Sequence, residues 1–382
     1  MGFEAAIQNI APMAILFNFA AFVVALIVIV FVHEFGHFIV GRWCGVKAEV
    51  FSVGFGKEMF GFTDKHGTRW KFAPIPLGGY VKFEGDANAA SMPSASPDVQ
   101  HSPTSLHAQP VWERMAVVAA GPIANFLLAI LIFAAGFMFL GLPYERPVVT
   151  AVVAGSAAEQ AGVKAGDLIV AVDGAKVLSY KDVQEAIFLR PGETFNLDLK
   201  RGEADMTLSV TPRVHEEKDG FGGMIKTGRL GIEHRRQPGE PLYQQFSPPA
   251  AFAKAADRVW FIVATTGKML GKIISGEQSA KQIGGAISIG KGAGDAASGG
   301  PIAFIEFLAF LSISIGIINL MPIPMLDGGH LVFYAIEAVR GKPLGQVAQE
   351  WGYRIGFSCV VMLMVLGLYN DAGRSLNVLF GT

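Results

Sequence analysis

The chain has 382 residues, of which 51% are hydrophobic and only 16% are charged, and its mean hydropathy is +0.41. This composition is more apolar and less charged than that of an average soluble protein, so it places the chain among membrane proteins. The formal net charge is −1 and no run of basic residues occurs, which excludes a nucleic-acid partner bound through phosphate contacts.

Four apolar runs are long enough to cross roughly 30 Å of hydrocarbon, which takes about 20 helical residues. They cover approximately residues 14–40, 117–142, 302–320 and 355–369. Basic residues follow the first run and lie between the last two: Arg42, Lys47, Lys57, Arg340 and Lys342. Because cytoplasmic loops are rich in Lys and Arg, we expect four spans with both termini outside.

The segment that follows the first span, residues 43–85, is expected on the cytosolic side. Its second half, TRWKFAPIPLGGYVKFEG (68–85), alternates apolar and polar residues about a Pro/Gly turn, which predicts a membrane-associated β-hairpin. Residues 86–111 are small, polar and proline-rich, which is typical of a disordered linker. Its His101 and His107 are not expected to bind metal, since ordering a flexible segment around an ion costs conformational entropy.

Residues 143–215 have the pattern of a small soluble domain, with β-like runs such as DLIVAVDG around the helical run SYKDVQEAIFLR. The stretch GSAAEQAGVKAGDLIVAVDGAKV resembles the PDZ domains of bacterial membrane-associated and periplasmic proteases. The resemblance implies that the domain binds an extended polypeptide along a sheet edge. A packing module that binds nothing is the alternative.

The remaining segments complete the expected organisation. Residues 216–248 are charged and glycine-rich, which indicates a linker, and residues 249–276 form an amphipathic helix whose cations favour the membrane surface over a weak fifth span. The membrane regions are predicted at 1–42, 112–142, 300–341 and 350–371. Cys44 and Cys359 fall near the inner face, where we expect free thiols.

The first span contains FVHEFGHFIV, residues 31–40. His33 and His37 are four residues apart and lie on one face of a helix, with Glu34 beside them. In this H-E-x-x-H arrangement the imidazoles bind zinc, and the carboxylate is the general base that takes a proton from the attacking water. A charged side chain in a membrane helix costs about 2.5 to 3.5 kcal/mol. We therefore interpret these residues as a functional site rather than a proton relay or a polar packing contact.

Catalytic zinc normally takes three protein ligands, so a further ligand is required. The stretch NLMPIPMLDGGH (319–330) offers Asp327, after two prolines that interrupt a helix and before two glycines that permit a tight turn. Irregular backbone at membrane depth is tolerated only where protein or a water-filled cavity surrounds it. We expect Asp327 near the inner ends of the spans with His33 and His37, and His330 is the less favoured alternative ligand.

HEFGH, GPIANF (121–126) and NLMPIPMLDGGH, with a PDZ-like domain between the last two, resemble the site-2 protease family of intramembrane zinc metalloproteases. Within it they resemble the bacterial RseP type, the regulator of sigma-E protease. The resemblance implies a Zn²⁺-dependent endopeptidase that cleaves transmembrane segments of single-span substrates, such as an anti-sigma factor already cut outside the membrane. It implies zinc ligation by His33, His37 and Asp327, catalysis by Glu34, and a place for Asn319 near the substrate backbone.

Two departures from the family pattern are evident. The RseP type has two tandem PDZ domains, whereas this chain has one, so it is a single-PDZ variant. Some members carry a second Asn where this chain has Ser314. Asn319 itself is expected to bind the substrate backbone or the developing oxyanion, or alternatively to satisfy carbonyls that Pro322 exposes. Gly121, Pro122 and Asn125 are expected to permit close helix packing rather than to act on substrate.

The expected fold is an α-helical multi-pass membrane protein with about four transmembrane helices, a β-hairpin that pairs with extended substrate, and an inserted α/β PDZ domain. By resemblance it lies in the bacterial inner membrane, with both termini and the PDZ domain periplasmic and the active site toward the cytosol. Its partners would be the transmembrane substrate, the lipid bilayer and a peptide or protein at the PDZ domain.

The sequence leaves two alternative functional classes. The first is a catalytically silent, membrane-tethered PDZ adaptor on a metalloprotease scaffold. Such a homologue would be expected to lose Glu34 or a ligand, and this chain keeps them all. The second is a transporter, which would need further ionisable residues along several spans, and only Glu306 qualifies.

Overall fold

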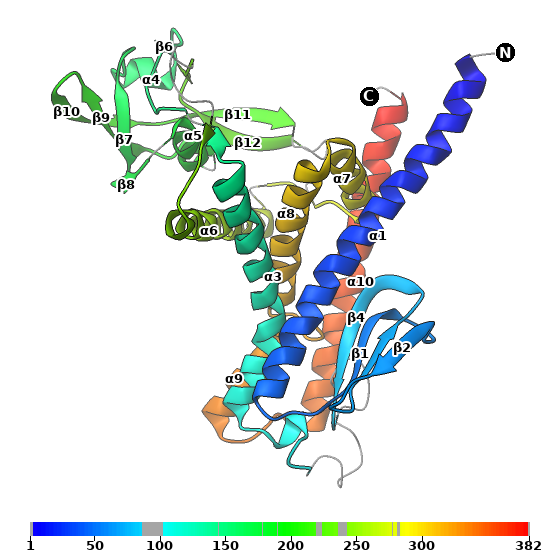
Figure 1. Ribbon diagram of the computed structural model, residues 1–382. Coiled ribbons are helices and arrows are strands. Elements are labelled where there is room, and N and C mark those ends of the chain that lie inside the picture. Colours follow the sequence, from blue (N-terminus) through cyan, green and yellow to red (C-terminus); the bar gives the residue numbers. More distant parts are fainter. Residues whose placement is uncertain are drawn as a thin grey trace. The chain divides into compact units, whose positions relative to one another are not determined.

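A computed structural model describes residues 3–85, 102–143, 145–177, 179–188, 190–218, 224–235, 243–276, 278–280 and 283–380 (Figure 1). The chain divides into two compact units. The first comprises Met1–Ala134, Phe252–Val263 and Ile283–Thr382, and the second comprises Ala135–Ala251 and Ala264–Gln282.

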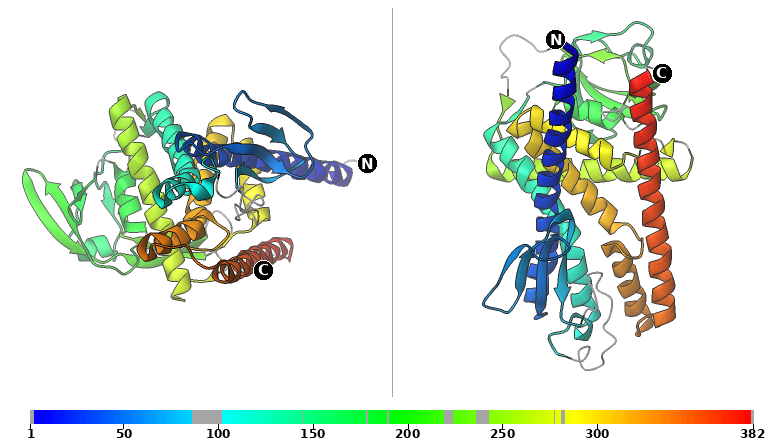
Figure 2. Two further views of the ribbon diagram at one scale, coloured as in Figure 1. Left: turned by 90° about the horizontal axis from the view of Figure 1, so that it is seen from below. Right: turned by 90° about the vertical axis from the view of Figure 1, so that its right-hand side faces the viewer.

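Long apolar helices form most of the first unit. Their bounds are α1 Phe3–Trp43, α3 Val111–Phe139, α7 Ala286–Ser298, α8 Pro301–Leu320, α9 Asp327–Arg340 and α10 Gln346–Phe380. Within the described residues, four helical stretches are long and apolar enough to cross a membrane: Met13–Trp43, Val111–Phe139, Pro301–Leu320 and Val347–Gly373. The four predicted spans are therefore confirmed. The start of α1 and the end of α10 lie at the same end of this unit, as four spans require (Figure 2).

Small residues let the membrane helices approach one another. A Cβ added to Gly36 of α1 would lie 2.4 Å from the carbonyl oxygen of Ala120 in α3, so the two backbones are in contact there. On α8, Ala309 and Ile313 are fully buried and pack with Ala129 of α3. These contacts hold α1, α3 and α8 together.

A four-stranded sheet lies beside the C-terminal half of α1 (Figure 1). Its strands are β1 Ala48–Phe55, β2 Phe60–Thr63, β3 Arg69–Phe72 and β4 Ile75–Phe83, in the order β2-β3-β1-β4. This corrects the hairpin predicted over 68–85, because β3 and β4 do not pair with each other. Both pair with β1, which is parallel to β3 and antiparallel to β4. The alternating pattern identified the two strands but not the earlier strand that separates them, and β4 is left as an edge strand.

The described part of the predicted linker 86–111 is ordered, so that expectation is corrected for residues 102–111. The backbone N–H of Lys47 donates to Thr104, and Leu106, in the 3-10 turn Leu106–Ala108, is buried with Phe38 and Phe51. A single apolar residue anchors this polar stretch to the sheet. His101 lies outside the described residues, and His107 lies in the 3-10 turn.

The second unit contains the predicted PDZ domain. Its strands are β5 Leu142–Pro143, β6 Ala151–Val152, β7 Leu168–Val172, β8 Ala175–Lys176, β9 Phe195–Arg201, β10 Ala204–Val210, β11 Arg213–Lys218, β12 Met224–Arg229, β13 Ile232–Glu233 and β14 Tyr243–Gln244. Its helices include α4 Ala157–Gln160 and α5 Tyr180–Phe188. The sheet order β10-β9-β7-β8 places Ile169, Leu197 and Leu199 in a core of aliphatic side chains closed by Val183 of α5.

The domain extends beyond the predicted boundary at residue 215. β11 pairs with β12, β13 pairs with β6, and Leu230 is buried in the domain core. Residues 224–233 therefore belong to the domain rather than to the predicted linker 216–248. The charged and glycine-rich composition of this segment concealed strands whose partners lie up to 82 positions earlier in the chain, between Ala151 and Glu233.

The predicted amphipathic segment 249–276 forms helix α6, Pro248–Ile274. Val259 and Ile262 on this helix pack in an apolar cluster with Ala129 of α3 and with Ile313 of α8. Within the described residues, α6 is not among the four stretches long and apolar enough to span a membrane. Its location on the membrane surface stays a prediction.

Candidate metal centre

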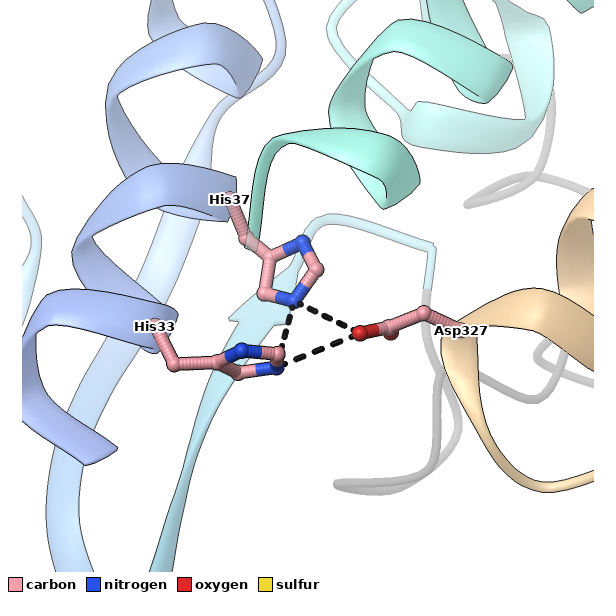
Figure 3. A group of neighbouring side chains, drawn as sticks. All are labelled: His33, His37 and Asp327. Carbon is pink, nitrogen blue, oxygen red and sulfur yellow. Dashed lines mark hydrogen bonds and ion pairs between the residues drawn. The ribbon is translucent and has the colours of Figure 1, made fainter. Parts of the chain in front are cut away.

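Three side chains from distant parts of the sequence meet in the first unit. His33 and His37 come from α1, and Asp327 is the first residue of α9 (Figure 3). The two Nε2 atoms are 3.2 Å apart, and Oδ2 of Asp327 lies 3.2 Å from Nε2 of His33 and 3.5 Å from Nε2 of His37. Helical spacing thus brings the two imidazoles onto one face, where the carboxylate from a distant segment meets them.

Helix α3 orients both rings through contacts with their Nδ1 atoms. The Nδ1 of His37 lies 2.9 Å from the carbonyl oxygen of Val117, and the Nδ1 of His33 lies 3.2 Å from the side-chain amide of Asn125. The Nδ1 of each ring therefore faces α3 and the Nε2 faces the cluster. Such hydrogen bonds to the outer nitrogen fix the orientation of a metal-binding imidazole.

Gly121 of α3 makes room for the two rings. A Cβ at this position would lie 2.2 Å from Nε2 of His37 and 2.9 Å from Cε1 of His33. Distances this short cannot be relieved without moving the imidazoles, because the rings are held from behind by α3. Glycine is therefore required here by the site itself.

The turn between α8 and α9 positions Asp327. Pro322 cannot continue α8, and Met325 has a φ of +84°, an uncommon conformation for a residue with a side chain. A Cβ on Gly328 would lie 2.3 Å from the last carbonyl of α8, and one on Gly329 would lie 2.4 Å from the carbonyl of Ile323. The two glycines therefore let α9 begin directly against the turn, with the carboxylate of Asp327 at the helix N-terminus.

These three residues fit a divalent metal ion. Oδ2 of Asp327 is buried and makes no hydrogen bond within the described residues, although two imidazole nitrogens face it. The two Nε2 atoms and a carboxylate oxygen converge on one point, and imidazole nitrogens with a carboxylate oxygen are the ligand set of a divalent cation such as zinc. Ligand atoms bound at about 2.0–2.1 Å around tetrahedral zinc are about 3.3–3.4 Å apart. The observed separations of 3.2, 3.2 and 3.5 Å match that spacing.

A cavity of about 200 Å³ adjoins the cluster. Its walls include Glu34 of α1, Asn319 of α8 and the β4 residues Gly79, Tyr80, Val81 and Phe83. Glu34 lies against β4, since a Cβ on Gly79 would be 3.2 Å from its Cγ. The cavity thus places a carboxylate and a carboxamide beside the ligand group.

The other candidate residues do not join the cluster. His330 lines the cavity, but its ring packs 5.8 Å from that of Tyr353, and the metal-ligating group in the described residues comprises His33, His37 and Asp327 without it. Ser314 donates to the carbonyl of Phe310 in its own helix, so it takes no part in the site. Cys44 and Cys359 are free.

Sequence reasoning missed two residues of the site. It assigned Gly121 and Asn125 to helix packing, whereas Gly121 lies against the imidazoles and Asn125 contacts His33. The available signal was the spacing within GPIANF. Gly121 and Asn125 are four residues apart, as His33 and His37 are. Each pair therefore lies on one face of its helix, and the two faces can pack against each other.

A buried ion pair joins the two elements that meet at the site. Arg114, in the first turn of α3, donates to both carboxylate oxygens of Glu337 in α9, at 3.0 and 2.6 Å. The guanidinium also lies 4.8 Å above the ring of Tyr334. Because α3 orients the histidines and α9 carries Asp327, this pair fixes the two halves of the ligand group relative to each other.

The comparisons with known proteins agree with this geometry. The family described as Peptidase family M50 matches residues 21–363. A candidate zinc metalloprotease of Agrobacterium fabrum is 45% identical over 354 residues, covering 92% of this chain and 94% of that protein. The regulator of sigma-E protease RseP of Salmonella typhimurium is 33% identical over an alignment of 462 residues that covers 95% of this chain and all of that protein.

A solved structure resembles part of the chain. It is the PDZ domain of an SdrC-like protein from Listeria monocytogenes, which is 23% identical, covers 24% of this chain and 90% of that domain, and has a TM-score of 0.20. The family assignment rests on the match over residues 21–363 and on relatives that align along nearly their whole length. The chain is a multi-pass membrane protein that belongs to peptidase family M50, the site-2 protease family of metalloproteases.

Proposed function

We propose that the chain is a zinc-dependent intramembrane endopeptidase that cleaves transmembrane segments of single-span proteins. The observation that carries this proposal is the enclosed group of His33, His37 and Asp327 beside Glu34 in a membrane helix. These three residues would bind Zn²⁺, which when bound acts as a Lewis acid that polarises a carbonyl and acidifies water.

The chain's own side chains supply the remaining chemistry. Glu34 lines the cavity next to the histidines, where it accepts a proton from the attacking water and returns it to the leaving amide nitrogen. Asn319 lines the same cavity, and its side-chain N–H donates to the substrate carbonyl as negative charge develops. Removing one such donor typically costs about 2.7–4 kcal/mol of transition-state stabilisation.

Strand β4 would hold the substrate in an extended form. A transmembrane helix satisfies its backbone hydrogen bonds internally, so a peptide bond must leave the helix before water reaches it. β4 is an edge strand of its sheet, and its Gly79 and Val81 line the cavity beside Glu34. Pairing of the unwound substrate with this edge would replace the lost helical hydrogen bonds and position a carbonyl for attack.

Tryptophan side chains support an active site near one membrane face. Trp43 at the end of α1 is 76% exposed and Trp112 at the start of α3 is 68% exposed, as expected of residues at a membrane interface. His33 and His37 precede Trp43 by ten and six residues, so they lie about 15 and 9 Å along the helix from it. With Arg42 adjacent, we assign this face to the cytosol, and both termini and the PDZ domain to the periplasm of the bacterial inner membrane.

The substrate class follows from the site and from one relative. The relative named regulator of sigma-E protease suggests a transmembrane anti-sigma factor, delivered after a first cut outside the membrane. In that scheme the PDZ domain either binds the new end of the substrate or excludes substrates with a bulky outer domain. Both roles make removal of the outer domain a condition for cleavage.

The proposal is tested with detergent-purified full chain and a model single-span substrate that has a truncated outer domain. Zinc content and cleavage are measured for wild type, Glu34→Gln and Glu306→Gln, a matched change at an exposed site in another membrane helix. We expect Glu34→Gln to keep zinc and lose cleavage and Glu306→Gln to keep both. A wild type that binds no metal and leaves the substrate intact, while a control protease cuts it, would favour the silent PDZ adaptor.

A further inference from the structure

The two imidazoles of the ligand group have different partners on their outer nitrogens. Nδ1 of His37 faces the carbonyl oxygen of Val117 at 2.9 Å, and a carbonyl can only accept a hydrogen bond. The ring therefore carries its proton on Nδ1, which leaves the Nε2 lone pair for the metal. The backbone of α3 alone sets this tautomer.

His33 requires the same tautomer but faces a side chain instead. Its Nδ1 lies 3.2 Å from the amide of Asn125, with the amide nitrogen on the near side. In that arrangement Nδ1 accepts, and the ring proton sits on Nε2, the nitrogen that faces the cluster. A proton on Nε2 occupies the position of the metal bond, so metal binding by His33 requires the other tautomer.

The oxygen of the same amide is buried and makes no hydrogen bond within the described residues. A half-turn of the amide exchanges oxygen and nitrogen with almost no change in shape, and it would set Oδ1 of Asn125 opposite Nδ1 of His33. Nδ1 would then donate to Oδ1, and the Nε2 lone pair would be free for a metal. In the exchanged orientation this buried oxygen has the ring N–H as its partner, and an unpartnered buried amide oxygen is destabilising.

The position of Asn125 is fixed by its burial in α3 and by a hydrogen bond from α8. Its side chain is fully buried in the middle of α3, four residues after Gly121 and on the face that meets the histidines. Its backbone carbonyl accepts a hydrogen bond from Oγ of Ser312 at 2.9 Å, which ties this turn of α3 to α8. The amide therefore has a fixed backbone and a ring nitrogen in front of it.

We propose that Asn125 is a positioning residue that accepts the hydrogen bond of His33 Nδ1–H in the metal-bound protein and so holds His33 Nε2 toward the ion. The inference rests on the proposed metal function of the cluster and extends it by one residue. Asn125 acts through His33 and does not touch substrate.

Zinc affinity tests the proposal without reference to cleavage. Zn²⁺ is titrated against a chelating indicator in detergent-purified full chain, as wild type, Asn125→Leu, Asn125→Asp and Ser314→Ala. Loss of such an outer partner typically weakens metal binding 10- to 100-fold, which we expect for Asn125→Leu. Asn125→Asp keeps an acceptor and should bind at least nearly as tightly as wild type. Ser314→Ala removes only a hydroxyl that bonds within α8 and should not change binding.

A Co²⁺-substituted sample separates positioning from a general loss of structure. Asn125→Leu should shift or weaken the visible absorption bands of tetrahedral Co²⁺, and Asn125→Asp should restore them. Equal zinc affinity in wild type and Asn125→Leu would overturn the inference about Asn125 and leave the proposed function intact. The same holds if Asn125→Asp binds zinc as weakly as Asn125→Leu. A wild type that binds no Zn²⁺ would overturn the proposed function together with this inference.

Discussion

One aspartate in each unit has a buried carboxylate oxygen, and the two carboxylates, those of Asp167 and Asp327, have opposite surroundings. In the PDZ unit, Asp167 receives hydrogen bonds from Nε and a terminal nitrogen of Arg201 at 2.7 and 2.8 Å and from the backbone N–H of Lys164 at 2.8 Å. In the membrane unit, Oδ2 of Asp327 is buried without a hydrogen bond and faces two imidazole nitrogens. One carboxylate is fully satisfied, and the other is arranged for a group that the chain does not supply.

The difference separates buried polarity that stabilises a fold from buried polarity that performs chemistry. A buried charge is tolerated when it is paired and hydrogen-bonded, and Asp167 meets that condition within its own domain. Asp327 does not meet it with the described protein atoms. A buried carboxylate oxygen that faces two imidazole nitrogens without a hydrogen bond therefore marks the functional site.

The largest effect on the metal site is expected when a side chain fills the space beside Gly121. In Gly121→Ala the new Cβ would lie 2.2 Å from Nε2 of His37, so the imidazoles must move away from Asp327. We expect zinc affinity to fall at least about 100-fold, the upper end for lost ligand orientation, and cleavage to disappear. Gly136→Ala in the same helix is the control, because nothing lies within 4 Å of its added Cβ. Equal zinc retention in both variants would show that the rings do not need this space.

An effect on stability rather than on metal binding is expected from the satisfied ion pair in the membrane unit. In Arg114→Leu, the mostly buried carboxylate of Glu337 loses both of its guanidinium hydrogen bonds. Breaking one side of a buried pair typically costs about 3–5 kcal/mol, whereas replacing both partners is often nearly neutral. Unfolding in mixed micelles should therefore show a large loss for Arg114→Leu and a recovery in Arg114→Leu/Glu337→Leu. A double variant as unstable as the single one would mean that packing, not charge, is lost.

The two units differ in how much of their structure could be predicted from the sequence. His33, Glu34, His37 and Asp327 were identified because ionisable residues and a broken helix are costly in a membrane and need a reason. The cost itself was the signal, and it is readable without a structure. The companion residue Asn125 carries no charge and sits in a motif of small residues, so the same reasoning assigned it to packing.

The sheet and the end of the PDZ domain were not predictable in the same way. Alternation identified β3 and β4, but strand pairing depends on partners far along the chain, and β1 separates these two. Likewise the pairing of β13 with β6 joins segments on either side of the whole domain. Local patterns report which residues are buried on a strand and do not report which strand lies beside it.

The satisfied aspartate of the PDZ unit predicts a moderate, pH-dependent effect. Burial acts to raise the pKa of Asp167, but the hydrogen bonds and charge of Arg201 and the N–H of Lys164 outweigh it and hold that pKa below its usual 3.8. A lowered pKa stabilises the fold above about pH 4, and this contribution is lost as the pH falls through the folded value. Arg201→Leu should cost about 2–3 kcal/mol at pH 7.

The measurement is amide hydrogen exchange of β7 and β9 in the full chain, corrected for the intrinsic exchange rate at each pH. Because protonated Asp167 no longer needs its partner, the difference between wild type and Arg201→Leu should shrink below about pH 4. A difference that stays constant from pH 7 to pH 3 would show that Arg201 acts through the packing of its side chain.

The smallest effect is expected one residue earlier in the same strand. Lys200 lies 3.7 Å from Asp205, and the two side chains are 51% and 79% exposed. Water screens this pair and both side chains lose freedom to form it, so Lys200→Leu should cost less than about 0.5 kcal/mol in the same exchange measurement. Adding salt should bring the stability cost of Lys200→Leu close to zero, since exposed charges are screened over about 8–10 Å. If Lys200→Leu cost as much as Arg201→Leu, the strand itself would be the sensitive element. The burial that distinguishes Asp167 from Asp205 would then have no energetic consequence.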